Sequence, residues 1–167
     1  MTAHAMFNVS ASDGLTATAG LGDERTTKGG ACYKYCQASG AIAAYALCHI
    51  TNAMLAIEST TTLMGTVLRP TGLIIPQFAV ATLEYFWGAI GPFYLRENGS
   101  TTFKVLAANA ATSVRLYTTA TAGVLDDAVT DGLITGLTLT ETVTTQEAAD
   151  CVAVQRLTGF CQRVTGV

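Results

Sequence analysis

Short apolar runs separated by glycine, proline, asparagine and threonine make up most of the chain from Ala31 onward. This pattern is typical of β-strands joined by turns. The clearest run is Phe78–Trp87, whose alternate residues form two largely apolar faces, so we expect a strand that is covered on both sides. The strands predicted from such runs are 31–37, 45–50, 53–58, 63–68, 78–87, 92–96, 102–106, 113–118, 133–143 and 151–157.

The turns between these runs have recognisable chemistry. Arg69–Gly72 contains a proline and a glycine, and Glu97–Ser100 contains the Asn-Gly pair that tolerates the positive φ of a tight hairpin. Strands at this spacing predict an all-β fold, a single β-sandwich or barrel-like domain, with helix limited to short stretches near 107–111 and 146–150. The candidate core residues are Tyr33, Tyr35, Leu83, Tyr85, Trp87, Leu116 and Leu137.

Residues 1–29 differ from the rest because they are mostly small and polar and cannot fill a core by themselves. We therefore predict an extended N-terminal arm over 1–29 and a β-rich domain over 30–167, with the arm held by a neighbouring subunit. The alternative is that the arm folds back on its own domain. Candidate contacts of the arm with other copies of the chain or with a larger assembly are Met6, Phe7, Val9, Leu15, Arg25 and Lys28.

The composition predicts a surface with few charged side chains. Half of the residues are hydrophobic and only 13% are charged, which is too few charges to coat a monomer of 167 residues in the usual way. The chain has 27 threonines and 26 alanines but three lysines, and threonine suits a pleated surface without carrying charge. We therefore expect part of the surface to be buried against other chains.

Charge and hydropathy exclude some partners. The net charge is −3 and the basic residues are scattered singly, whereas phosphate binding needs clustered cations, so we expect no nucleic-acid partner. The start of the chain lacks the pattern of a secretory signal, which predicts synthesis in the cytoplasm. Residues 35–57 carry no acidic or basic residue, but polar side chains interrupt them and anchoring flanks are missing, so we expect a buried or interface segment and no membrane partner.

Candidate catalytic and metal-binding residues are few. Only His4 and His49 are available as histidine bases, and His49 lies inside an apolar run. Cys32 and Cys36 would be about 13 Å apart on a strand, too far to share one zinc ion. We expect the cysteines to be packing residues, the acidic run Asp126–Asp131 to cap turns, and the protein to have no enzymatic activity, metal or cofactor. A small thiol or metal protein built on Cys32, Cys36, Cys48 and His49 remains the alternative of another class.

Two blocks of the sequence resemble a known family. The block 28–43, KGGACYKYCQASGAIA, is similar to an early strand of small structural proteins of tailed-bacteriophage heads, and PQFAVATLEYFWGAIGPF and LYTTATAGVLDDAVTDGLITGLTL within 76–139 resemble their aromatic strand and later segments. Phe86-Trp87 stands where that family usually has Gly-Trp.

The resemblance implies a decoration or cement subunit that binds the major capsid protein on the outside of the virion, commonly as a homotrimer. Another virion component, such as a head fibre or a tail protein, is the nearer alternative.

Overall fold

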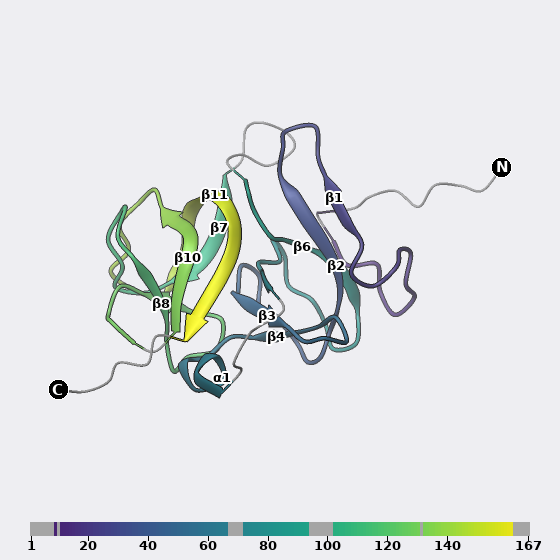
Figure 1. The fold of residues 1–167 in the computed structure, drawn as a ribbon, viewed down its shortest axis with the longest axis horizontal. Helices are drawn as coiled ribbons and strands as arrows, with labels where there is room; N and C mark the ends of the chain where they lie inside the picture. Colours follow the sequence, from purple (N-terminus) through teal and green to yellow (C-terminus); the bar gives the residue numbers. More distant parts are fainter. Residues whose placement is uncertain (1–8, 10, 67–71, 94–101, 131, 162–167) are drawn as a thin grey trace.

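The computed structural model describes residues 9, 11–66, 72–93, 102–130 and 132–161. These residues form a curled β-sheet and a closed β-barrel that lie side by side (Figure 1). The prediction of an all-β, barrel-like fold with little helix is confirmed.

The first sheet is built around β2 (Cys32–Ala38). One side of β2 pairs with β1 (Glu24–Thr26) and then with β4 (Leu55–Glu58), while the other side pairs with β6 (Tyr85–Ala89). Beyond β4 lie β3 (Cys48–Ile50) and β5 (Leu73–Ile74). The sheet curls, because a bridge between Ile75 and Ala89 joins the segment after β5 back to the end of β6.

The barrel contains β7 (Phe103–Ala107), β8 (Leu116–Thr118), β9 (Leu125–Asp126), β10 (Gly132–Leu139) and β11 (Glu147–Cys161). Its strands close in the order β10-β11-β7-β9-β8, and this closure leaves no unpaired edge in the barrel. The helix α1 (Thr61–Thr66) packs against β8, β10 and β11 and lies across one end of the barrel (Figure 1).

A hydrophobic core joins the sheet to the barrel. Side chains alternate across β2, so Tyr33 and Tyr35 enter the core shared with the barrel, while Cys36 and Ala38 enter a smaller core on the other face. Phe103 of the barrel stacks on Phe93 at 4.3 Å between ring centroids and meets Tyr33 at 6.1 Å. The sheet and the barrel therefore share one apolar interior.

The candidate core residues are placed as follows. The structure buries Tyr33, Tyr35, Trp87, Leu116 and Leu137, and it leaves Tyr85 partly buried against the same core. The prediction that Leu83 belongs to the core is wrong, because its side chain is 54% exposed. It has a positive φ of 66° in the turn before β6, which directs it away from the core face expected from simple alternation.

Several predicted elements need correction. The strand predicted over 63–68 is wrong for its described residues, 63–66, because they belong to the helix α1. The Thr60 hydroxyl caps the start of this helix by accepting a hydrogen bond from the Leu63 amide. The strand predicted over 78–87 is confined to β6, because residues 81–84 form a turn in which the Glu84 amide donates to the Ala81 carbonyl.

The two predicted short helices are also wrong. Residues 107–111 are the end of β7 and a turn at Asn109, which has a φ of 48°, and residues 147–150 are the start of β11 paired with β7. Sequence analysis missed the short strands β1, β5 and β9. The predicted hairpin at 97–100 and most of the turn at 69–72 lie outside the described residues.

A charged cluster ties β1 to the barrel strand β11. The Arg156 guanidinium makes two hydrogen bonds to the Glu24 carboxylate, one of them 2.9 Å long, and the Lys34 ammonium lies 3.0 Å from the same carboxylate. The hydrogen bond from Arg156, with the charge of Lys34, lowers the pKa of Glu24 from its ordinary value of 4.5 to about 2.

We expect this cluster to make stability depend on pH. A lowered folded-state pKa stabilises the protein above the unfolded-state value of about 4.5, and this contribution is lost as the pH falls toward 2. Urea unfolding of the wild type and of Glu24→Gln at pH 7 and pH 3 should therefore show the variant losing less stability on acidification. Glu147→Gln, on the exposed start of β11, is the control and should follow the wild type. Parallel pH profiles for all three proteins would contradict the prediction.

Candidate functional site: contact surfaces

Residues 13–22, here called the strap, cross the first sheet from β6 to β1. The Asp13 amide donates to the Tyr85 carbonyl at 2.8 Å, and the Tyr85 amide donates to the Gly14 carbonyl at 2.9 Å. At the other end of the strap, the Gly22 amide donates to the Tyr35 carbonyl at 2.9 Å. Backbone hydrogen bonds therefore fix both ends of the strap to the sheet.

The buried Tyr35 hydroxyl holds the middle of the strap. It donates a hydrogen bond of 2.7 Å to the Asp13 carboxylate and accepts one of 3.0 Å from the Thr18 amide. The Thr18 hydroxyl bonds to the same carboxylate. Burial, together with the nearby Asp13 charge, raises the pKa of Tyr35, so the phenol stays protonated as a donor at neutral pH.

Removing this hydroxyl should loosen the strap. In Tyr35→Phe, the Asp13 carboxylate and the Thr18 amide each lose a partner, and we expect the free energy of unfolding to fall by about 0.5–1.5 kcal/mol. Hydrogen exchange should accelerate at amides 13–22 and stay unchanged in β10, which serves as the internal control. Equal protection of the strap in both proteins would show that the hydroxyl does not hold it.

The described part of the predicted arm lies along its own domain. Val9 is partly buried against the shared core, and the segment 22–26 is hydrogen-bonded to β2. Folding back, which sequence analysis gave as the alternative, is thus what the described residues do. Met6 and Phe7 lie outside the described residues.

The other predicted contact residues lie at the surface. Leu15 is 73% exposed, Arg25 is exposed in the middle of β1, and Lys28 is exposed just after β1. The Arg25 guanidinium lies 5.3 Å from the centroid of the Trp87 ring, so it covers this otherwise buried aromatic residue by a cation–π contact. Arg25 therefore belongs to the packing of the sheet as well as to its surface.

Exposed leucines gather around the strap. Leu15 follows the Gly14–Tyr85 bridge directly, and Leu83 precedes that bridge by two residues on the partner segment, so register places both at the same edge. Leu21, 44% exposed, lies at the other end of the strap, next to Gly22, where an added Cβ would lie 3.5 Å from the Met54 side chain. We call Leu15 and Leu83 the leucine patch. Sequence analysis identified only Leu15, although leucines in a glycine-rich segment were a usable signal for Leu21.

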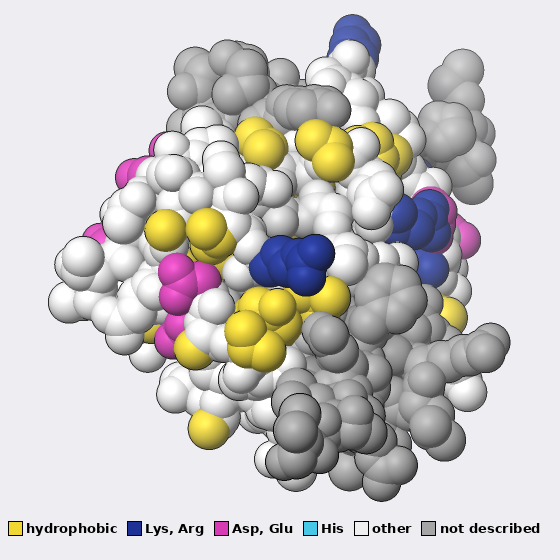
Figure 2. All heavy atoms as spheres, turned by 60° about the vertical axis from the view of Figure 1, so that its left-hand side comes forward, with side chains coloured by type: hydrophobic (Ala, Val, Ile, Leu, Met, Phe, Trp, Pro, Cys, Tyr) yellow, Lys and Arg dark blue, Asp and Glu magenta, His cyan; other side chains and the backbone are white. Residues whose placement is uncertain are grey.

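A second surface lies at the barrel end away from α1. The loops 108–115 and 140–146 meet there through a bridge between Ala110 and Val143. Their exposed side chains are mainly threonine, serine and asparagine, with Val114, Arg115 and Glu141 among them. Figure 2, with the barrel side turned forward, shows hydrophobic side chains in small separate groups on a surface with few charges. Such a surface can bind a partner with little loss of charge solvation.

Among the described residues, the candidate catalytic and metal-binding side chains do not converge on one site, and His4 lies outside the described residues. Burial raises the pKa of Cys36 to about 12 and that of Cys48 well above its ordinary value, so both thiols stay protonated and are poor nucleophiles. Cys32 and Cys36 lie on the continuous strand β2, which holds them about 13 Å apart. Among the described residues no group of three His, Cys, Asp or Glu side chains is placed to hold a metal ion.

The remaining candidates are His49 and the acidic run Asp126–Asp131, and their described residues make contacts within the fold. His49 is buried on β3, and burial lowers its pKa. In the acidic run, the Asp126 carboxylate accepts a hydrogen bond of 2.7 Å from the Ala128 amide, and Asp127 accepts one of 3.2 Å from the Ala111 amide. The Asp126 carboxylate therefore caps a local turn, whereas Asp127 joins its segment to the distant loop 108–115.

Two further results bear on function. In the described part of the chain, no helix has the length and apolar character needed to cross a membrane. Comparison of the chain with protein families, with curated proteins and with solved structures found no match.

Proposed function

We propose that this protein is a capsid decoration or cement subunit that binds the outside of a tailed-phage head, contacts the major capsid protein and stabilises the contacts between capsomers. The observation that carries the proposal is the leucine patch, in which the strap presents Leu15 and the turn before β6 presents Leu83, both strongly exposed beside the backbone hydrogen bonds that fix the strap to the sheet. The resemblance of the blocks 28–43 and 76–139 to head structural proteins supports it. The role is structural, with no catalytic step.

Burial of the exposed leucines against a partner would remove apolar surface from water. A fully buried leucine contributes about 1.5–3 kcal/mol relative to an exposed one, and a surface assembly repeats this contribution in every copy. A contact surface held by hydrogen bonds loses little conformational entropy on binding. A homotrimer, with the sparsely charged barrel end or the leucine patch contacting other copies, fits the same surface chemistry.

The test is binding to purified, expanded phage heads. Wild-type protein should bind saturably at near-stoichiometric copy number, and Leu15→Asp/Leu83→Asp should bind roughly a hundredfold more weakly, because two buried contacts are replaced by charges. Val129→Asp is the matched control, since Val129 is 68% exposed in a barrel loop outside the patch. Absence of wild-type binding would overturn the proposed function, and equal binding by the double variant would exclude the leucine patch as the contact.

A further inference from the structure

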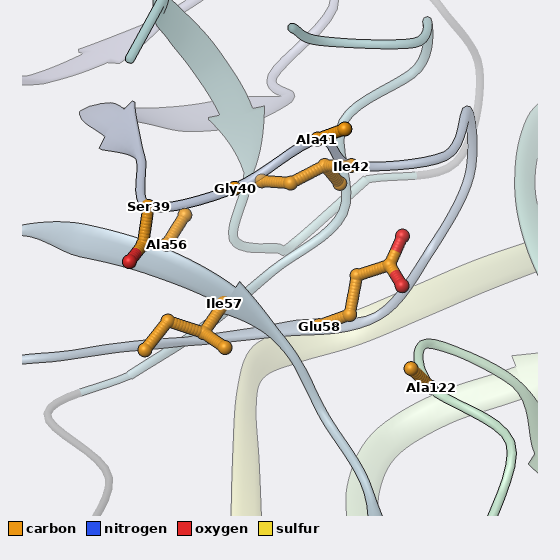
Figure 3. Close-up of a pocket in the computed structure, with 8 residues that line it drawn as sticks. All are labelled: Ser39, Gly40, Ala41, Ile42, Ala56, Ile57, Glu58 and Ala122. Carbon is orange, nitrogen blue, oxygen red and sulfur yellow. The ribbon is translucent and has the colours of Figure 1, made fainter. Parts of the chain in front are cut away.

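A hollow of about 300 Å³ lies where the first sheet meets the barrel. Its walls are the turn 39–42 after β2, the residues Ala56–Glu58 of β4, and Ala122 in the loop between β8 and β9 (Figure 3). Three segments distant in sequence therefore build it. Its size is at the lower end of the range for small-ligand pockets.

The lining is apolar except for a hydroxyl and a carboxylate. Ile42 and the alanines supply apolar side-chain walls, Ser39 supplies the hydroxyl, and Glu58 is the ionisable residue of the lining. The Ile57 side chain points to the opposite side of β4 from Glu58 (Figure 3). In Figure 3 the Glu58 carboxylate projects from the end of β4 toward the space between Ile42 and Ala122. The site is thus a short apolar hollow with one negative charge.

The fold holds this carboxylate in position. Its Oε1 accepts a hydrogen bond of 2.7 Å from the Ala43 amide, which leaves Oε2 to accept from an incoming donor. The barrel loop approaches closely at Gly123, where a Cβ would lie 2.5 Å from the Ala46 Cβ and 3.6 Å from the Glu58 Cδ. With a φ of 73°, Gly123 gives the loop the conformation that closes this side of the hollow.

We propose that the hollow receives a lysine or arginine side chain of a partner protein. The aliphatic stem of such a side chain would contact Ile42 and the lining alanines, and its cationic head would make a charge-assisted hydrogen bond to Glu58. A neutral apolar group would leave the carboxylate without a partner, and an anion would be repelled by it. The identity of the partner as the capsid protein rests on the proposed function; the preference for a cation does not.

The first experiment uses n-butylammonium chloride as the probe, followed by amide chemical shifts in NMR. Saturable shifts are expected at 39–42 and at Ala122, with 1-butanol producing none. Glu58→Gln keeps the acceptor for the Ala43 amide and should bind the probe about tenfold more weakly or worse. Glu84→Gln is the matched control and should bind normally, because the Glu84 carboxylate also accepts from a backbone amide, that of Ala81 at 3.0 Å, but lies outside the hollow.

A second variant keeps the test valid if Glu58→Gln fails to fold. Ala41 is exposed, so Ala41→Leu should fold, and its larger side chain should fill the hollow and weaken probe binding while Glu58 is intact. Equal shifts with 1-butanol and the ammonium, or unchanged probe binding in both variants, would overturn the inference.

The partner is tested separately with purified heads. Glu58→Gln should bind them at least about fivefold more weakly than wild type and Glu84→Gln. Full head binding by Glu58→Gln would overturn the assignment of the hollow to the capsid contact. Failure of wild type to bind heads while the ammonium still binds would overturn only the proposed function.

Discussion

Replacing Trp87 with alanine is expected to lower the free energy of unfolding by about 3–5 kcal/mol. Trp87 is 2% exposed at the centre of β6, opposite Tyr35 in the β2 ladder, with the two ring centroids 4.9 Å apart. Its removal would leave a cavity beneath Arg25, whose guanidinium lies over the indole ring. Urea unfolding followed by circular dichroism measures the change.

Leu83→Ala is the informative control for this experiment. Both residues belong to the one apolar run that predicts a strand over 78–87, but Leu83 is more than half exposed and should change stability by less than about 0.5 kcal/mol. A comparable loss in both variants would contradict the placement of Leu83 outside the core. A small loss for Trp87→Ala would contradict its burial.

Gly91→Ala is expected to be the second most damaging change, at about 2–5 kcal/mol. Gly91 has a φ of 74°, and a Cβ there would lie 2.4 Å from the backbone carbonyl oxygen of Gln155. This close approach is part of the joint where β11 meets the first sheet, since the Leu157 amide donates to the Ile90 carbonyl at 2.8 Å. The substitution should therefore push the barrel strand away from the sheet.

Gly14→Ala separates backbone strain from the steric clash. Gly14 has nearly the same φ, 73°, but an added Cβ there meets no atom within 4 Å. We expect Gly14→Ala to lower the free energy of unfolding by about 1–2 kcal/mol, which is the cost of placing a Cβ on left-handed backbone. Thermal and urea unfolding should show that Gly91→Ala is clearly less stable than Gly14→Ala. Equal losses of stability in the two variants would show that β11 can move away from Gly91 at little cost.

Most of the predicted core residues are buried in the structure, and Leu83 is not. Tyr33, Tyr35 and Trp87 are buried because aromatic residues at alternate positions of paired strands share one face, a relation that period-two spacing displays directly. Leu83 shows the limit of that reasoning, because a positive φ in a turn changes side-chain direction without leaving a periodic signal.

The strap shows a different limit. Its small polar residues correctly indicate that it cannot form a core, but they do not reveal that the Tyr35 hydroxyl and the Tyr85 backbone hold it on the sheet. Those partners are separated from the strap by more than a dozen residues in sequence. The leucine patch depends on this placement and was therefore predictable only at Leu15.

The sequence by itself determined the all-β class, most of the longer strands and the sparsely charged exterior, because these follow from local alternation and composition. Only the tertiary structure decided the closure of the barrel, the start of β11 at residues expected to be helical, and the hollow at Glu58. Each of these depends on contacts between distant segments, and such pairing overrides weak local propensity.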